Sequence, residues 1–226
     1  MVSKLKGRVL VISGSDPSGG AGLQGDIKTI TSLGGFSTNA ITAITNQDTK
    51  KVYDIYDLDS LFVAKQIKTV LNDIGSDSIK IGMLSNPEII QCVSLTLSKY
   101  AKNIPIVLDP VMSSQSGFKL IEHNYKENLL SHLISKCLII TPNLPEAEIL
   151  TGKTIRSVSD MIESIDSLRK LGAEAVLLKG GHLEGSHLTD LLITKEKYFR
   201  YDSNKIDTSS THGTGCALSS AIATRS

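Results

Sequence analysis

Two kinds of apolar stretch alternate along most of the chain. The first kind is short, continuous and rich in Val, Ile and Leu, which is typical of strands buried on both faces of a sheet. These runs lie at Val9–Ser13, Thr38–Thr45, Ile79–Met83, Ile104–Leu108, Cys137–Thr141 and Ala175–Lys179. The second kind has apolar residues at helical spacing and lies at Gly22–Leu33, Leu61–Ile74, Pro87–Tyr100, Tyr125–Leu133 and Asp160–Leu171. This alternation predicts β-α-β units that build a parallel sheet covered by helices on both faces.

The pattern changes after Lys179. His187–Thr194 and Lys197–Asp202 are short strand-like stretches separated by two residues, which predicts an antiparallel hairpin at a sheet edge. No internal repeat or Pro/Ser-rich linker interrupts 1–226, so we expect a single domain. The predicted fold class is α/β, a three-layer α/β/α arrangement with a mostly parallel central sheet and an antiparallel edge hairpin. In such sheets ligands bind beyond the carboxyl ends of the strands, so the segments that follow the strands are the candidate sites.

The charge balance excludes several classes of partner. The 226 residues carry 24 Lys and Arg against 23 Asp and Glu, whereas proteins that bind nucleic acid or anionic membranes usually show a large basic excess. The apolar runs are too short to span a bilayer. Cys92, Cys137 and Cys216 lie far apart and form no Cys-x-x-Cys pair, which argues against zinc and disulfide frameworks. We therefore expect a reduced cytoplasmic protein that binds neither nucleic acid nor membrane.

A glycine-rich segment, Ser13 to Gly22, follows the first predicted strand. Gly20 to Gly25 formally matches the dinucleotide motif G-x-G-x-x-G, but six residues separate this match from the strand, where the first glycine should follow almost at once. A Walker P-loop also fails, because Gly20-Ala21 stands where Lys-Ser/Thr is required. A loop of small residues that lets a ligand approach the backbone remains. Asp26, on the following helix, is either a ligand-binding side chain or a solvated first-turn carboxylate.

A second glycine-rich segment, Thr211-His212-Gly213-Thr214-Gly215-Cys216, opens an apolar helix near the end of the chain. Backbone N–H groups and the helix dipole form an anion site there, suited to a phosphoryl group in transfer. The same dipole stabilises a thiolate, so we expect the pKa of Cys216 to lie below its ordinary value. The alternative is a glycine that caps a helix beside a buried cysteine.

Six motifs together resemble the hydroxymethylpyrimidine/phosphomethylpyrimidine kinases of thiamine biosynthesis, in the ribokinase superfamily. The resemblance runs from about Arg8 to Ala223. The motifs are Gly14-Ser15-Asp16-Pro17-Ser18-Gly19-Gly20-Ala21-Gly22, Lys80-Ile81-Gly82-Met83-Leu84, Leu108-Asp109-Pro110-Val111-Met112, Thr141-Pro142-Asn143-Leu144-Pro145-Glu146-Ala147, Leu178-Lys179-Gly180-Gly181-His182 and Thr211-His212-Gly213-Thr214-Gly215-Cys216. Cysteine after Gly213-Thr214-Gly215, where the sugar and adenosine kinases have aspartate, points to the pyrimidine group.

The resemblance implies a ribokinase-like kinase that uses ATP and Mg²⁺. It would phosphorylate 4-amino-5-hydroxymethyl-2-methylpyrimidine and then its monophosphate to the diphosphate. By the same resemblance, Gly213, Thr214 and Gly215 would hold the transferring group through backbone N–H groups, and Cys216 would be the catalytic base. Asn143, Lys179 and Gly181 would bind the nucleotide. Asp109 and Glu146 would hold Mg²⁺, or alternatively serve as a helix N-cap and a first-turn acid.

The pyrimidine would be bound, again by resemblance, by residues near the first, second, third and fourth predicted strands. They are Gly14, Asp26, Thr45, Gln47, Met83 and Val111. Gln47 presents a donor and an acceptor together, which matches an aminopyrimidine edge. The segment from Thr45 to Thr49 departs from the Ala-Gln-Asn-Thr wording that is usual in the family.

The resemblance also leaves alternatives and implies a homodimer. Some relatives accept pyridoxal or pyridoxine, so a pyridoxal-type vitamin kinase is the second candidate. The family's chains continue into further helices after the Gly-Thr-Gly-Cys helix, whereas this sequence ends at Ser226. A catalytically inactive, pyrimidine-binding chain is therefore the third candidate, and an uncovered apolar patch is expected where those helices would pack.

Overall fold

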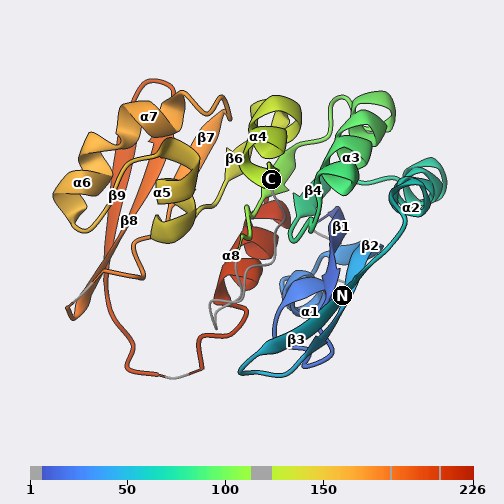
Figure 1. Ribbon diagram of the computed structural model, residues 1–226, viewed down its shortest axis with the longest axis horizontal. Coiled ribbons are helices and arrows are strands. Elements are labelled where there is room, and N and C mark those ends of the chain that lie inside the picture. The colour runs from blue at the N-terminus through green and yellow to red at the C-terminus, as the bar shows by residue number, and fades with distance from the viewer. Residues whose placement is uncertain (1–6, 113–123, 184, 209) are drawn as a thin grey trace, which may run out of the picture.

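A computed structural model of the protein describes residues 7–112, 124–183, 185–208 and 210–226 (Figure 1). The described residues form one nine-stranded sheet in the order β3-β2-β1-β4-β5-β6-β7-β8-β9. The strands are β1 (Arg8–Ser15), β2 (Phe36–Gln47), β3 (Val52–Asp57), β4 (Ser78–Ile81), β5 (Ile106–Leu108), β6 (Ile139–Ile140), β7 (Ala175–Leu178), β8 (His187–Thr194) and β9 (Tyr198–Asn204). The strands from β2 through β7 in this order pair in parallel, and β8 and β9 form the expected antiparallel hairpin at one edge. The predicted fold class is confirmed.

The opposite edge of the sheet carries β3, a strand that the hydrophobic pattern does not predict. β3 pairs antiparallel with β2 across a tight turn, where the Asp48 carboxylate accepts hydrogen bonds from the backbone N–H groups of Lys50 and Lys51, each at 2.7 Å. Most β3 side chains are exposed or half-buried, so the strand lacks the continuous apolar run that marks a buried strand.

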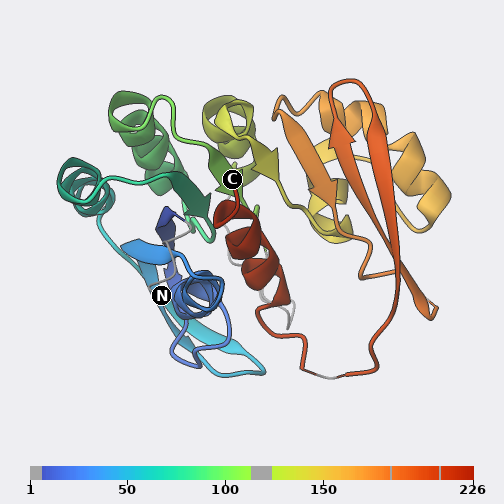
Figure 2. The same cartoon turned by 180° about the vertical axis from the view of Figure 1, so that it is seen from behind.

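Helices cover the two faces of the sheet unequally (Figures 1 and 2). The helices are α1 (Gly22–Ser32), α2 (Ser60–Asp73), α3 (Pro87–Tyr100), α4 (Tyr125–Asn128), α5 (Leu144–Thr151), α6 (Val158–Glu163), α7 (Ile165–Arg169) and α8 (Thr214–Ala223). Alternate β1 residues face opposite cores, because successive strand side chains point to opposite faces. Leu10 and Ile12 belong to the larger core under α2–α7, and Val9 and Val11 belong to the core under α1 and α8.

Two predicted helices are less regular than their spacing suggested. The stretch Asp160–Leu171 is divided into α6 and α7 at Ser164, whose buried hydroxyl donates to the carbonyl oxygen of Met161 at 2.7 Å. The stretch Tyr125–Leu133 begins as α4 and then continues as a π-helical turn over Leu129–Leu133. The apolar spacing identified both segments correctly, but it does not report such local changes in hydrogen bonding.

Helices lie on both faces of the sheet, as expected, but they leave part of one face uncovered in the described structure. In Figure 2 α1 and α8 lie over the first half of the sheet, while no helix of the described chain lies over β7, β8 and β9 on that face. Leu177 and Leu192 are half-buried there, and Phe199 and Tyr201 of β9 are exposed. An apolar strip is thus uncovered on this side of the described structure. None of the described helices has the length and apolar character needed to cross a membrane.

Candidate functional site

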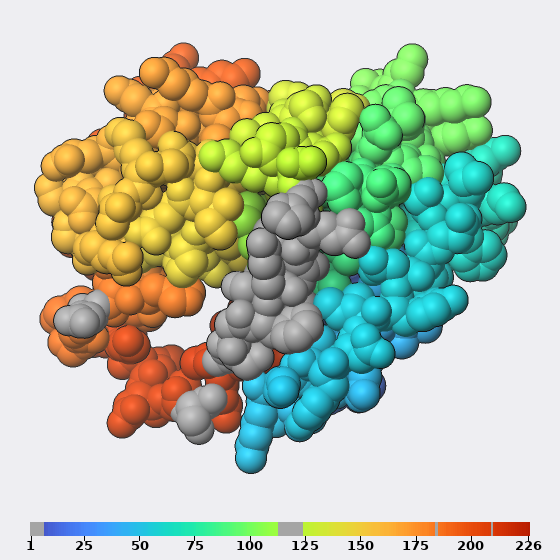
Figure 3. Space-filling view, viewed as in Figure 1, coloured from blue at the N-terminus to red at the C-terminus, as the bar shows by residue number. Residues whose placement is uncertain are grey.

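A cavity of about 1000 Å³ lies at the carboxyl ends of the parallel strands. Its walls come from the loops after β1, β4, β5, β6 and β7, from the end of β2, and from the chain between β9 and α8. Figure 3 shows the molecule hollowed between the segment after β9, in red, and the region of α5, in yellow. This is the position at which α/β sheets bind ligands.

The fold brings nearly all of the predicted site residues to this one cavity. Those that line it are Gly14, Thr45, Gln47, Met83, Asp109, Val111, Asn143, Glu146, Lys179, Gly181, Gly213, Thr214, Gly215 and Cys216. They come from both halves of the sheet, with the first turn of α8 between them. The cavity therefore has two ends, one at β2, β1 and β4 and the other at β6 and β7.

Asp26 lies outside the cavity, contrary to the expectation of direct ligand binding. Its side chain is completely buried and forms an ion pair with Lys80 of β4, whose side chain is also 0% exposed; the Oδ2–Nζ distance is 2.7 Å. The other carboxylate oxygen accepts a hydrogen bond from the Ser220 hydroxyl of α8, also at 2.7 Å. Burial disfavours the charged form of Lys80, but the Asp26 carboxylate outweighs it and holds the pKa of Lys80 above its ordinary value. Burial also raises the pKa of Asp26, against the opposing effect of the Lys80 ammonium. Asp26 thus fastens α1, β4 and α8 together beneath the cavity.

Lys80 was not assigned a role from the sequence. A lysine within the otherwise apolar motif Ile79-Lys80-Ile81 was the available signal, because a lysine inside a buried strand requires a partner. The sequence does not show which of its carboxylates reaches that lysine.

The two glycine-rich loops interlock at the cavity wall. The Asp16 carboxylate accepts hydrogen bonds from the backbone N–H of Ala21 at 2.8 Å and contacts Nε2 of His212 at 2.9 Å. Burial favours a higher pKa for Asp16, but the hydrogen bonds from His212, Ser18 and Ala21 outweigh it and lower that pKa. Gly213 caps α8 with φ +82°, and a Cβ there would collide with the carbonyl oxygen of Gly20. Asp16 and His212 therefore hold the start of α8 against the first loop, a pairing that sequence motifs alone did not indicate.

Cys216 lies in the first turn of α8, half-buried at the cavity wall. The pKa of its thiol is raised to about 11, mainly by burial. The carboxylates of Asp26 and Asp109 also raise this pKa. The Lys80 ammonium and a hydrogen bond from the Gly22 N–H lower it, but they do not outweigh the other effects. The expected lowering by the helix dipole is therefore wrong. Desolvation and two nearby carboxylates outweigh the favourable backbone dipoles.

Two carboxylates and one ammonium group form the polar centre of the cavity. Asp109, just after β5, accepts hydrogen bonds on Oδ1 from Thr141 Oγ1 at 3.0 Å and from Lys179 Nζ at 3.1 Å. Glu146 belongs to a capping box at the start of α5, where it accepts from the Asn143 N–H at 2.8 Å. Burial, and then the charge of Asp109, raise the pKa of Glu146. The first-turn role considered for Glu146 is present in the structure, and the same residue also lines the cavity.

Less polar side chains form the other end of the cavity. Met83 packs with Ala43 and Val52, and Val111 packs against this group. Thr45 Oγ1 donates to the carbonyl oxygen of Ser15 at 2.9 Å and lies 3.2 Å from Oε1 of Gln47. This end can hold a flat ring between apolar side chains and present an amide to its edge.

The comparisons with known proteins agree on the family. The model of the phosphomethylpyrimidine kinase family matches residues 16–226. The hydroxymethylpyrimidine/phosphomethylpyrimidine kinase of Escherichia coli is 42% identical over 215 residues, which are 95% of this chain and 80% of that protein. The thiamine biosynthesis bifunctional protein ThiED of Geobacter sulfurreducens is 42% identical over 97% of this chain, but the match spans only 44% of that longer protein.

Solved structures show the same fold. The crystal structure of phosphomethylpyrimidine kinase from Clostridium difficile superposes with a TM-score of 0.83 and 44% identity, covering 98% of this chain and 90% of that one. The ADP complex of Bacillus subtilis pyridoxal kinase superposes with a TM-score of 0.87 at 32% identity, covering 96% of this chain and 82% of that one.

Proposed function

The chain belongs to the phosphomethylpyrimidine kinase family, and on that premise we propose that it transfers the γ-phosphoryl group of ATP to 4-amino-5-hydroxymethyl-2-methylpyrimidine and then to the resulting monophosphate. The observation that carries the proposal is the two-ended cavity. One end offers Gln47 between apolar side chains, the other offers Asn143, Lys179 and carboxylates, and the Gly213–Cys216 turn lies between them.

The residues at the centre supply what phosphoryl transfer requires, which is alignment and compensation of negative charge. Backbone N–H groups at the start of α8 point at the transferring group, and Lys179 adds a full positive charge beside it. Asn143 Oδ1 accepts from the Glu146 N–H, so its side-chain NH₂ remains as the donor to nucleotide phosphate. Cys216 is placed to take the proton of the acceptor hydroxyl.

The donor set at the centre fits Mg²⁺. Asp109 and Glu146 place two carboxyl groups beside one ammonium group, Lys179, and burial and the charge of Asp109 raise the pKa of Glu146 to about 7. A divalent cation between them would relieve this repulsion and favour the ionised form of Glu146. Magnesium in kinases is usually held by one or two carboxylates together with waters and substrate phosphates, which agrees with only two acidic side chains here. When bound, the ion neutralises charge on the phosphate oxygens.

Replacing Gln47 with alanine tests the assignment of the pyrimidine end. We expect the KM for the pyrimidine to rise about 10- to 100-fold, because a buried ring edge would lose its hydrogen-bonding partner. The KM for ATP should stay within about twofold, because Gln47 lies on β2, far across the sheet from β6 and β7. Steady-state kinetics with each substrate varied in turn measure both values, and equal losses for the two substrates would contradict the placement.

A pyridoxal-type kinase is the second candidate, because the structures of pyridoxal kinases superpose at least as well as that of the pyrimidine kinase. The higher sequence identity to the pyrimidine kinases favours the first candidate. Turnover of pyridoxal and of the pyrimidine, compared as kcat/KM under one set of conditions, separates the two.

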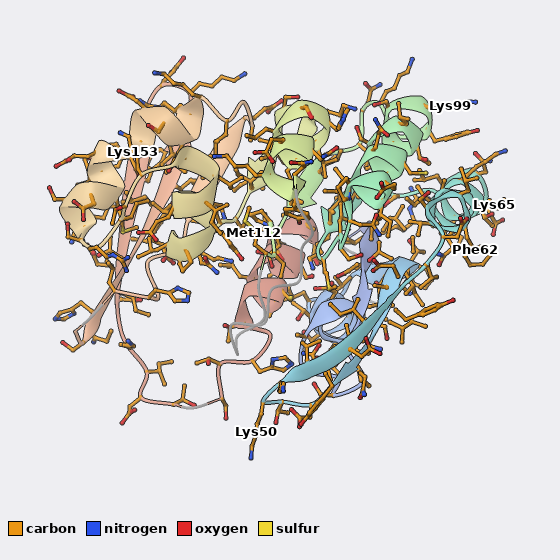
Figure 4. All side chains as sticks on the ribbon, in the orientation of Figure 1. Lys50, Phe62, Lys65, Lys99, Met112 and Lys153 are labelled. Atoms are coloured by element: carbon orange, nitrogen blue, oxygen red, sulfur yellow. The ribbon has the colours of Figure 1, made fainter. Side chains whose placement is uncertain are left out.

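We also propose that the protein is a homodimer formed through β2, β3 and the start of α2. Large apolar side chains are exposed there, including Phe62, labelled in Figure 4. Ile44 and Tyr56 are direct cross-strand partners, and Tyr56 is 73% exposed. An apolar surface of this kind is typical of an interface between protein chains. Sedimentation equilibrium should find a dimer, and a Tyr56→Glu variant should be a folded monomer; a monomeric parent protein at micromolar concentration contradicts the proposal.

The three free cysteines favour a reducing compartment, and we place the protein in the cytoplasm. Cys216 in particular must stay reduced, because oxidation would replace the thiol that the proposed function uses as the base.

A further inference from the structure

Cys216 lines the cavity at the start of α8, between the two ends to which the proposed function assigns the pyrimidine and the nucleotide. Its turn joins the two ends of the cavity, and the N–H of Gly22 donates toward the sulfur from the first loop. The neighbouring residue Gly215 is held against Lys179 and Asp109: a Cβ on Gly215 would lie 3.2 Å from Lys179 Nζ and 3.7 Å from Asp109 Oδ2. The turn that carries Cys216 is therefore close to Lys179 and Asp109, and the proposed function uses the same turn in both phosphorylation steps.

The two acceptors differ in the proton that they carry. In the first step the acceptor is an alcohol, which keeps its proton at neutral pH and must lose it as the new O–P bond forms. In the second step the acceptor is a phosphate monoester, whose second ionisation has a pKa of about 6, so the attacking oxygen carries no proton. Only the first step requires a base.

The two acceptors also differ in charge. The alcohol is neutral, whereas the monoester brings almost two negative charges to the turn at the start of α8. The surroundings hold three acidic side chains, Asp26, Asp109 and Glu146, and two ammonium groups, Lys80 and Lys179. Burial raises the pKa of Asp26 and, together with the charge of Asp109, that of Glu146 to about 7, so further negative charge is disfavoured there. A charged side chain at position 216 would add negative charge, whereas a neutral thiol would not.

We propose that Cys216 sets the acceptor range of this site: its sulfur takes the proton of the alcohol acceptor, and its lack of charge in the resting state admits the phosphate of the second acceptor. The inference rests on the proposed function and adds that one residue serves the two steps in different ways. A thiol that is neutral at rest and loses its proton during the first step is compatible with both acceptors. A carboxylate, which is always charged, is compatible only with the alcohol.

The proton and electron balance of each step follows from this. In the first step the thiol gives its proton to water, the acceptor oxygen forms a bond to the γ-phosphorus, and the sulfur takes the hydroxyl proton. The bond between the γ-phosphorus and the β-phosphate oxygen breaks, and ADP leaves with the electron pair. In the second step the monoester oxygen attacks and ADP leaves in the same way, with no proton transferred to sulfur.

Substitutions at position 216 test the proposal when the two steps are assayed separately, with the alcohol or the monophosphate as the starting acceptor. We expect Cys216→Ala to lose 100-fold or more in kcat on the alcohol, the usual contribution of a general base, but less than about tenfold on the monophosphate. Cys216→Ser, which is neutral and a poor base, should show the same selectivity. Cys216→Asp should do the opposite, with on the order of 100-fold loss on the monophosphate through repulsion of like charges and a much smaller loss on the alcohol.

Cys92→Ala is the matched control, because Cys92 is a free, half-buried thiol on α3 that does not line the cavity. Both activities of this variant should stay near those of the parent. Equal losses on the two acceptors in both the alanine and the serine variants overturn the proposal, even if the aspartate variant does not fold. A parent chain that phosphorylates neither acceptor contradicts the proposed function itself, which distinguishes the two failures.

Discussion

Replacing Lys80 with methionine is expected to lower the free energy of unfolding by about 3–5 kcal/mol, the cost of leaving one partner of a buried ion pair without its counter-charge. Asp26 is completely buried and has no access to water, so its carboxylate would keep only the Ser220 hydroxyl as a partner. Urea unfolding followed by circular dichroism measures the change.

A double variant distinguishes loss of charge balance from loss of packing. Lys80→Met combined with Asp26→Asn removes both charges, and most of the lost stability should return. Arg200→Met is the matched surface control, because the Arg200–Asp202 pair is about half exposed on both sides and its loss should hardly move the unfolding midpoint. A double variant that is no more stable than the single one would show that the ion pair is not what the lysine contributes.

The second large effect is expected at Lys179. Lys179→Met should lower kcat/KM for ATP by 100- to 1000-fold, the usual cost of removing a donor aimed at charge that develops in the transition state. The substitution also leaves Asp109 and Glu146 without their shared counter-charge. We therefore expect kcat/KM for ATP to depend more steeply on the Mg²⁺ concentration in the variant than in the parent. Kinetics at several Mg²⁺ concentrations measure both effects.

The controls for this prediction are two other lysine substitutions. Lys179→Arg keeps the charge but not the shape of the ammonium group and should recover part of the activity. Lys153→Met, far from the cavity beyond α5, should leave the kinetics unchanged (Figure 4). Comparable losses at Lys153 and Lys179 would show a general effect of charge and contradict a local role.

The sequence predicts the layered fold because a parallel sheet requires strands that are apolar on both faces, and six such runs stand out. The hydrophobic pattern does not predict β3, because it is an edge strand whose side chains are mostly exposed or half-buried. The same pattern does not predict that the helix is divided into α6 and α7 at Ser164. The hydrogen bond from the Ser164 hydroxyl to the preceding turn leaves the spacing of apolar residues unchanged. Local hydrogen bonding and edge position are therefore poorly visible in a hydrophobic pattern.

The site was predictable to the extent that its residues follow strands or open helices. Asp109, Lys179 and the Gly213–Cys216 turn come together because parallel strands end at one edge of the sheet. The sequence does not place Asp26, because its position on α1 is equally compatible with facing a ligand or facing β4. Only the three-dimensional packing shows that Lys80 lies opposite. The direction of the Cys216 pKa shift cannot be predicted from the local sequence for a related reason, since the burial and the neighbouring carboxylates that raise it come from distant parts of the chain.

Coupled ADP release by the unmodified chain is the most direct test of the proposed function. The chain is incubated with ATP, Mg²⁺ and 4-amino-5-hydroxymethyl-2-methylpyrimidine, with pyridoxal in a parallel reaction, and the products are identified by mass spectrometry. We expect ADP release that depends on the pyrimidine, a monophosphate that appears first, and a diphosphate that accumulates until two ADP have formed per pyrimidine. Release that depends on pyridoxal alone, or no release above the background hydrolysis of ATP, would contradict the proposed function.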